Sequence, residues 1–298
     1  SGAISLSDGY GASAVTPWMG DRGIFGGGYT SYTYYNVIQY ITITTTGNSV
    51  DFGDLTIGRS NLTACSNSSR GVFLGGQSSS ANMNSIDYIT ISTTGNATDF
   101  GDLTQARPGS AALANTTRGV TGGGGATTPF TSTGIDYITI ATTGNASSFG
   151  TVSALSRNMS ACSSDTRGVF FAVNSTTAAT IEYITIATTG NSTDFGDMTS
   201  GSLGTSAFSD GSRGVYGSIT NIEYVTIAST GNATDFGDLS VGRSRSGACA
   251  NSTRGVWGGG DNYQPAIIDY VTIASTGNAT DFGDMVTPVS SLSGCSGD

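Results

Sequence analysis

The sequence predicts an all-β fold, a six-bladed β-propeller of four-stranded antiparallel blades with about 46 residues each. Two six-fold repeats predict it. A tripeptide of an acidic or amide residue, tyrosine and a β-branched residue recurs six times in the 298 residues, and an Arg-Gly pair recurs six times in phase with it. The segments between these motifs are short and rich in Gly, Asn, Ser and Thr, and they carry no helical period.

Each repeat has three landmarks. The tyrosines lie 41 to 49 residues apart, at Tyr40, Tyr88, Tyr137, Tyr183, Tyr224 and Tyr270. Each is followed by Thr-Gly-Asn and then by a Phe-Gly pair, with the aromatic residue at Phe52, Phe100, Phe149, Phe195, Phe236 and Phe282. Five of the six Phe-Gly copies read DFGD, and the third reads SSFGT. The repeat arginines are Arg22, Arg70, Arg118, Arg167, Arg213 and Arg254.

Four short strands account for each repeat. In chain order they are the stretch before the arginine (SGACANS in the last complete repeat), the Arg-Gly strand (RGVWGGG), the tyrosine strand (IDYVTIAS) and the DFGD strand. In the tyrosine strand of the second repeat, Ile86 and Tyr88 point to one face while Ile89 and Ile91 point to the other. A strand that is apolar on both faces is covered on both sides, as in a propeller blade packed between two neighbours.

The two ends of the chain predict how the ring closes. After the sixth DFGD the chain supplies a first strand around Cys295 but no Arg-Gly strand, and the N-terminal part supplies Arg22-Gly23 without a complete first strand. Pairing the N- and C-terminal strands completes one blade and leaves no free sheet edge. An open solenoid is the alternative. We expect residues 20–298 to form this single domain and residues 1–19 to form a linker.

The composition excludes several function classes. Eleven arginines and no lysine stand against 21 acidic residues, for a net charge of −10, so we expect no nucleic-acid partner. The chain has no histidine, which excludes Ser-His-Asp hydrolases and His-ligated metalloenzymes. The apolar stretches are far shorter than the roughly 20 residues that cross a bilayer, so we expect no membrane insertion. We expect no enzyme activity, no cofactor and no metal.

The four cysteines share one position in the repeat. Each lies five residues before the repeat arginine or before the place where that arginine would stand, and two other repeats hold Leu113 and Phe208 there; the cysteines are Cys65, Cys162, Cys249 and Cys295. A position that accepts Cys, Leu or Phe is predicted to be an apolar core site, with neither a disulfide nor zinc. Free thiols fit a protein folded in a reducing cytoplasm.

The repeat arginines and the DFGD aspartates are predicted to be structural partners that bridge strand ends. Calcium binding by the ten DFGD aspartates is the competing interpretation. Two aspartates three apart on a regular strand point to opposite faces, which argues against calcium. The chain also holds eleven N-x-S/T sequons, among them Asn61, Asn96, Asn145, Asn232 and Asn278. They are either glycan acceptors or, as we favour, a result of the Asn-, Ser- and Thr-rich composition of the repeat, with TGNAT as the outer hairpin turn in which Gly and Asn supply positive φ.

The landmarks resemble a degenerate kelch repeat. SGACANSTRGVWGGG carries the kelch-like Gly258-Gly259 pair, and the following strands carry Tyr270, with Phe282 where kelch repeats place a tryptophan. The resemblance covers about residues 20 to 298 and implies a propeller, but it says little about function. Arrays of near-identical repeats with this sequence also look like those in virion and tail-fibre proteins of marine bacteriophages. The opening SGAISLSDGYGAS is similar to a short linker in phage tail proteins.

The loops between the Arg-Gly and tyrosine strands vary most between repeats, which is typical of a recognition surface. Their aromatic and amide residues are the predicted binding residues, because tyrosine gives a large amphipathic contact at low entropic cost. These residues are Tyr29, Tyr32, Tyr34, Tyr35, Phe130, Asn262, Tyr263 and Gln264. The alternative is that these aromatic side chains cover a neighbouring subunit or a preceding domain.

The resemblance to phage proteins implies a non-catalytic module on the virion surface, made in the host cytoplasm. We expect it to act in a tail fibre or adhesin that binds a glycan or protein of the host envelope, together with other virion proteins, in a larger assembly or homo-oligomer. Three alternatives remain: a capsid-decoration or filament subunit, a secreted glycosylated kelch-like binding protein, and a glycan-cleaving propeller. The last requires two convergent carboxylates in a central pocket.

Overall fold

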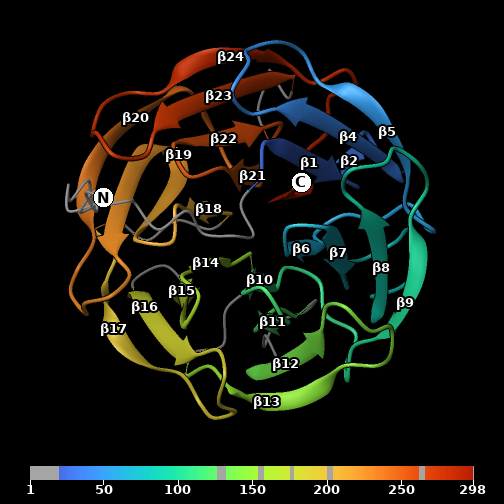
Figure 1. Ribbon diagram of the computed structural model, residues 1–298, viewed down its shortest axis with the longest axis horizontal. Helices are drawn as coiled ribbons and strands as arrows, with labels where there is room; N and C mark the ends of the chain where they lie inside the picture. Colours follow the sequence, from blue (N-terminus) through green and yellow to red (C-terminus); the bar gives the residue numbers. More distant parts are fainter. Residues whose placement is uncertain are drawn as a thin grey trace, which may run out of the picture.

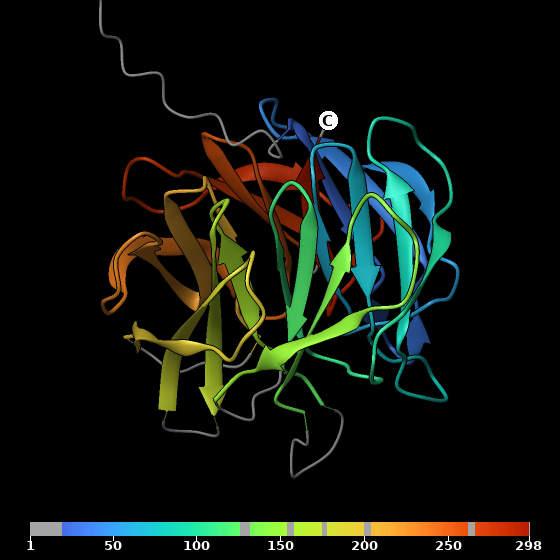
Figure 2. The same ribbon diagram turned by 60° about the horizontal axis from the view of Figure 1, so that its bottom comes forward.

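The computed structural model describes residues 20–125, 132–153, 158–174, 178–199, 204–261 and 266–297. Six antiparallel sheets stand around a central axis (Figure 1), so the predicted all-β, six-bladed propeller is confirmed. In an oblique view, the sheets stand next to one another around the ring (Figure 2). The described part of the chain contains no helix long and apolar enough to cross a bilayer.

In each blade the first strand lies nearest the axis and the fourth lies at the rim (Figure 1). The inner strands are β25 (Ser293–Gly297), β6 (Thr63–Ser66), β10 (Ala111–Ala114), β14 (Ser160–Ser163), β18 (Ser206–Ser209) and β21 (Gly247–Ala250). The second strands are β1 (Arg22–Gly26), β7 (Arg70–Leu74), β11 (Arg118–Gly122), β15 (Arg167–Asn174), the first part of β19 (Arg213–Thr226) and β22 (Arg254–Gly258). The third strands are β4 (Val37–Thr42), β8 (Ser85–Thr90), β12 (Gly134–Thr139), β16 (Ala178–Thr185), the second part of β19 and β23 (Ile267–Thr272). The outer strands are β5 (Val50–Asp54), β9 (Thr98–Asp102), β13 (Ser147–Thr151), β17 (Thr193–Asp197), β20 (Thr234–Arg243) and β24 (Thr280–Asp284).

Two blades depart from the simple order. In the fifth, β19 runs through both middle strands: its first part pairs with β18 and its second part pairs with β20. The chain reverses between the two parts, close to Ile219, which has φ 54°. In the first blade, β1 pairs with the C-terminal β25 on one side and with β4 on the other. The two ends of the described chain therefore complete one sheet and close the ring, as predicted.

A β-bulge recurs between the third and outer strands of every blade. In the second blade Ile86 pairs with Gly101 and Asp87 pairs with Asp99, which leaves Phe100 as the extra residue. Phe100 is buried, so the bulge turns the repeat aromatic into the space between blades. The next residue is glycine in all six copies.

Among the described residues, six separate hydrophobic clusters make up the core, and each lies between two neighbouring blades. The third strand of a blade contributes to two of them. Ile86 and Tyr88 pack in the cluster between blades 2 and 3, while Ile89 and Ile91 pack in the cluster between blades 1 and 2. The prediction that this strand is covered on both faces is confirmed.

The outer strands are also paired along their rim-facing edges. Gly95 N donates to Phe52 O over 2.8 Å, and Ala97 N donates to Asp54 O over 2.7 Å. Between them, Asn96 Oδ1 accepts a hydrogen bond from Asp54 N over 3.1 Å. The Thr-Gly-Asn segment of each blade makes the same three contacts with the preceding blade all around the ring. The rim therefore offers little free strand edge to another chain.

Candidate functional site

The most variable loop of the first blade forms a hairpin of its own, the tyrosine hairpin, from β2 (Tyr29–Thr30) and β3 (Thr33–Tyr34). Its two-residue turn is Ser31-Tyr32, with φ of 43° and 75°, as in a type I′ turn. Non-glycine residues occupy this region of φ only at a cost in free energy. Tyr32 at the tip is 91% exposed, so the hairpin holds one large aromatic ring in solvent.

The other three tyrosines build and anchor the tyrosine hairpin. The rings of Tyr29 and Tyr34 meet edge to face with centroids 5.1 Å apart. Tyr35 packs against the hydrophobic cluster between blades 6 and 1, and its Oη accepts a hydrogen bond from Thr30 Oγ1 over 3.1 Å. The four residues predicted as one group therefore divide into a structural set and one ring, that of Tyr32, that is free for contact.

The inner strands of the six blades surround a central channel, and the tyrosine hairpin stands at one end of this channel. Tyr29 N donates to Ser290 O over 2.8 Å, and Ser290 N donates back to Tyr29 O over 3.1 Å. On the other side, Arg59 N donates to Tyr35 O over 3.1 Å. Ser291, the residue after Ser290, lines the channel. The other predicted binding residues, Phe130, Asn262, Tyr263 and Gln264, lie outside the described residues.

A closed ring of backbone hydrogen bonds surrounds the same end of the channel, which we call the mouth. Six equivalent residues with φ between 51° and 82° form it, one before each inner strand: Asn61, Gly109, Asn158, Gly204, Arg245 and Ser291. Backbone amides at these positions, with Met159 N serving in the fourth blade, donate to the neighbouring blade over 2.7 to 3.4 Å. Glycine and asparagine suit this backbone conformation, so a Gly or Asn four residues before the cysteine position was the sequence signal for the ring.

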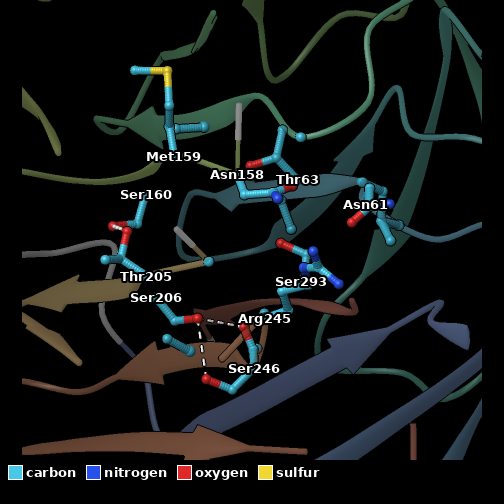
Figure 3. Close-up of a pocket in the computed structure, with 18 of the residues that line it drawn as sticks. Asn61, Thr63, Asn158, Met159, Ser160, Thr205, Ser206, Arg245, Ser246 and Ser293 are labelled. Carbon is cyan, nitrogen blue, oxygen red and sulfur yellow. Dashed lines mark hydrogen bonds between the residues drawn. The ribbon is translucent and has the colours of Figure 1, made fainter. Parts of the chain in front are cut away.

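The mouth opens into a cavity of about 110 Å³ lined largely by hydroxyl and amide groups (Figure 3). The Ser160 and Thr205 hydroxyls are 2.8 Å apart, and Ser206 Oγ donates to Ser246 O over 2.5 Å. Ser246 Oγ in turn donates to Ser206 Oγ over 3.1 Å. The buried Ser110 Oγ, also in the lining, has no hydrogen-bond partner among the described residues. These neutral groups can hold a polar molecule through hydrogen bonds.

One charged pair stands at the mouth. Arg245 Nη1 lies 2.9 Å from Asp261 Oδ2, and the two side chains are 42% and 36% exposed. Of the described residues that line the mouth, Arg245 is the charged one. Asp261 is held beside it because its amide donates to Ser244 O over 2.7 Å.

The repeat arginines have partners other than the predicted ones. Arg70 lies over the Tyr88 ring, 4.2 Å from its centroid, and Nη1 donates to Ile140 O of the next blade over 2.9 Å. All six repeat arginines make this pair of contacts, at 4.2 to 4.9 Å and 2.7 to 2.9 Å. The predicted bridge to DFGD carboxylates is wrong, because the ion pairs among the described residues involve other arginines. The arginines link blades through a carbonyl and a cation–π contact.

The DFGD aspartates face solvent at the rim; nine of the ten are exposed and one is half-buried. The prediction that the two aspartates of each DFGD point to opposite faces is also wrong. The bulge interrupts the alternation, so Asp99 and Asp102 pair with Asp87 and Ser85, which lie two apart and share a face. Within the described residues, no group of three His, Cys, Asp or Glu side chains gathers closely enough to hold a metal ion.

A second set of arginines, missed in the sequence, is buried in the segments that precede the inner strands of blades 2, 3 and 6. The shortest N–O distances are 3.1 Å for Arg59–Asp87, 3.1 Å for Arg107–Asp136 and 2.5 Å for Arg243–Asp269. Burial lowers the pKa of each guanidinium, and the adjacent carboxylate works against that shift. The available signal was an arginine six residues before the cysteine position, present in only three repeats.

The four cysteines are buried and free, so the predicted apolar position is confirmed. Each repeat's residue at this position covers the Arg-Gly glycine of the next blade: a Cβ on Gly119 would lie 2.9 Å from Cys65 Sγ, for example. Burial raises the pKa of the Cys65, Cys162 and Cys249 thiols and raises that of Cys295 to about 12. The thiols therefore stay protonated at neutral pH.

We expect the native protein to react with no measurable amount of a thiol reagent such as Ellman's reagent at pH 8, because the thiolate is the reacting form. After unfolding in guanidinium chloride, all four cysteines should react. Because the folded pKa lies above the unfolded one, this protonated state favours the fold below about pH 9 and the contribution is lost as pH rises further. Rapid labelling of the native protein would contradict the burial of the thiols.

Several sequon asparagines already have structural roles. Asn96 and Asn145 dock on the preceding blade, and Asn67 Oδ1 caps the turn before Arg70 through hydrogen bonds from Ser69 N and Arg70 N. The predicted turn geometry needs correction, because the asparagines of Thr-Gly-Asn do not have positive φ. The reversal lies earlier, as where Thr45 N donates to Thr42 O over 3.0 Å.

A comparison of the sequence with models of known protein families and with curated proteins finds no match.

Proposed function

We propose that this propeller is a non-catalytic binding module that contacts a glycan or protein of a host cell envelope with the face that carries the tyrosine hairpin and the mouth. The observation that carries the proposal is Tyr32, which is 91% exposed at the tip of a hairpin found in one blade only among the described loops. The φ values of Ser31 and Tyr32 add support, since residues in costly backbone conformations collect at functional sites.

The proposal places the module on the surface of a bacteriophage virion, as part of a tail fibre or a similar attachment protein. The resemblance of the repeat to phage tail-fibre arrays supports this setting. Four unpaired, buried thiols are compatible with folding in the host cytoplasm before release.

The structure bears on the alternatives. A filament built by pairing rim strands would have to displace the Thr-Gly-Asn segments, because they already bond to the outer strands. The secreted, glycosylated alternative places a glycan on asparagines such as Asn96. The side-chain oxygen of Asn96 already accepts a hydrogen bond from Asp54 N of the preceding blade, and glycosylation would have to preserve this contact. The neutral hydroxyl and amide groups of the mouth can hydrogen-bond to a polar ligand, but such groups do not act as general acids or bases near neutral pH.

Replacing Tyr32 by alanine should abolish or strongly weaken binding of the labelled protein to its target cells without changing its unfolding temperature, because this side chain is 91% exposed. The measurement is flow cytometry with a panel of marine bacterial strains and their purified envelope polysaccharides. Ile219→Ala is the matched control, since Ile219 is 56% exposed and also has positive φ in the corresponding loop of the fifth blade. Equal binding by Tyr32→Ala and the unmodified protein would refute the proposal. Normal cell binding with failed particle assembly would favour the capsid or filament role.

A further inference from the structure

Arg245 occupies a backbone position that suits other residues. Its φ is 57°, and four of the five equivalent positions around the mouth hold asparagine or glycine, namely Asn61, Gly109, Asn158 and Gly204. Glycine tolerates this conformation because it has no Cβ, and asparagine because its short polar side chain can hydrogen-bond locally, whereas arginine adopts it at a cost. A strained residue points to a role for its side chain.

The contacts of the Arg245 side chain do little for stability. Its ion pair with Asp261 is solvent-exposed, and such pairs contribute little to the free energy of folding. The guanidinium has five N–H donors, and one of them bonds to Asp261. The carboxylate likewise keeps accepting capacity. The pair therefore presents hydrogen-bond donors and acceptors side by side to solvent.

The Arg245–Asp261 pair and the tyrosine hairpin flank the same part of the mouth. Ser291 N donates to Arg245 O over 2.9 Å, and the preceding residue, Ser290, is bonded in both directions to Tyr29. Ser246, the residue that follows Arg245, adds its half-buried hydroxyl to the wall of the cavity (Figure 3). The backbone of Ser290 and Ser291 thus links the Arg245–Asp261 pair to the tyrosine hairpin where blades 6 and 1 adjoin.

Sugar rings match this set of groups. Neighbouring hydroxyls on a sugar both donate and accept hydrogen bonds, which fits a guanidinium beside a carboxylate, and the C–H face of the ring packs on aromatic side chains. The Arg245–Asp261 pair has no net charge, and the whole protein carries −10. An acidic sugar would meet a repulsive overall field, whereas a neutral one would not.

We infer that a neutral sugar binds at the part of the mouth where blades 6 and 1 adjoin, and that Arg245 and Asp261 recognise its hydroxyl groups beside the tyrosine hairpin. This inference rests on the proposed function, because it names the ligand class for the same face.

The test uses the whole 298-residue protein and isothermal titration calorimetry. The probes are oligosaccharides ending in galactose, glucose, mannose or N-acetylglucosamine, each with a counterpart ending in sialic acid or a uronate. The variants are Arg245→Asn and Asp261→Asn. The matched control, Asp165→Asn, removes the same charge as Asp261→Asn from an exposed turn at the opposite end of the channel.

We expect at least one neutral oligosaccharide to bind more tightly than its acidic counterpart, with a Kd that changes less than about twofold between 0.05 and 0.5 M NaCl. Arg245→Asn and Asp261→Asn should weaken binding by about tenfold or more, and Asp165→Asn should leave it unchanged. Arg245→Asn should also raise the unfolding temperature by about 2 to 4 °C, because asparagine suits the backbone there. A purely structural role for Arg245 predicts the opposite change in stability.

Three results would overturn the inference. Preference for acidic sugars, or binding that falls steeply with salt, would exclude a neutral ligand. Neutral-sugar binding that survives both Arg245→Asn and Asp261→Asn would place the sugar elsewhere, and the proposed function would stand if Tyr32→Ala still abolished cell binding. Absence of binding by every oligosaccharide in the panel, with Tyr32-dependent cell binding intact, would point to a protein ligand on this face.

Discussion

Replacing Gly150 by alanine is expected to lower the free energy of unfolding by about 3 kcal/mol or more. Gly150 is the Phe-Gly glycine of the third blade, and a Cβ there would overlap the carbonyl group of Gly190, in the Thr-Gly-Asn segment of the fourth blade. The obstacle is backbone, which cannot turn away as a side chain can. The blade interface must open, or both strands must shift.

Gly190 supplies the matched control from the other side of the same contact. A Cβ on Gly190 would meet nothing within 4 Å, and neither glycine has φ in the left-handed region. Gly190→Ala should therefore change the free energy of unfolding by less than about 1 kcal/mol. Urea unfolding of both variants, followed by circular dichroism, measures the difference. Equal stabilities would show that the outer contact between blades contributes little.

The same contact recurs between every pair of neighbouring blades. At Gly101, for example, a Cβ would lie 2.6 Å from the carbonyl of Gly144, and the φ of 142° adds backbone strain for any other residue. The third blade has lost both DFGD acids but keeps the glycine. The constant part of this motif is therefore the close approach of two backbones, and its acids are solvent-facing additions.

Much of the fold could be predicted because the same sequence pattern occurs in all six blades. The spacing of the tyrosines fixed the number of blades, the apolar faces of the third strand indicated packing on both sides, and the incomplete repeats at the two ends indicated how the ring closes. A position that accepts Cys65, Leu113 and Phe208 could only be apolar. In each case a pattern repeated between blades carried the information.

Contacts between blades were harder to predict, because they depend on the stagger of adjacent sheets. Opposite charges in Arg70 and the DFGD acids favoured an ion pair, but the guanidinium reaches a carbonyl of the next blade and the Tyr88 ring. The bulge at Phe100 is a change of register, which residue alternation does not reveal. Regular strand periodicity therefore gave the wrong face for the outer aspartates.

The candidate site was predicted in part. Loop variability directed attention to Tyr32 and its neighbours, yet the mouth beside them was missed, since its ring of positive φ residues is spread over six repeats with different residues. Arg245 appears in one repeat only. A residue that breaks a repeat carries little weight in a sequence argument, although it marks the point where one blade differs from the others.

The buried ion pair Arg59–Asp87 of the second blade is absent from the first blade, where uncharged residues occupy the two equivalent positions. In the first blade Val289 takes the place of the arginine and Gln39 that of the aspartate. Gln39 Oε1 accepts hydrogen bonds from Thr287 N and from Ser49 Oγ, each over 2.8 Å. An apolar residue beside a neutral acceptor is thus a working arrangement at the same place in the blade.

We expect Arg59→Val alone to lower the free energy of unfolding by about 3 to 5 kcal/mol, since it leaves the Asp87 carboxylate buried without its counter-charge. Asp87→Gln alone should cost a similar amount, because it isolates the guanidinium. The double variant should lose only about 2 kcal/mol or less, since no buried charge remains and Gln can accept the hydrogen bond that Thr56 N donates to Asp87. A double-mutant cycle by urea unfolding gives the coupling energy, and the same cycle on the exposed Arg245–Asp261 pair should give less than about 1 kcal/mol. If the two single losses at Arg59 and Asp87 simply add, the pair does not act as a unit, and the difference between the blades has another cause.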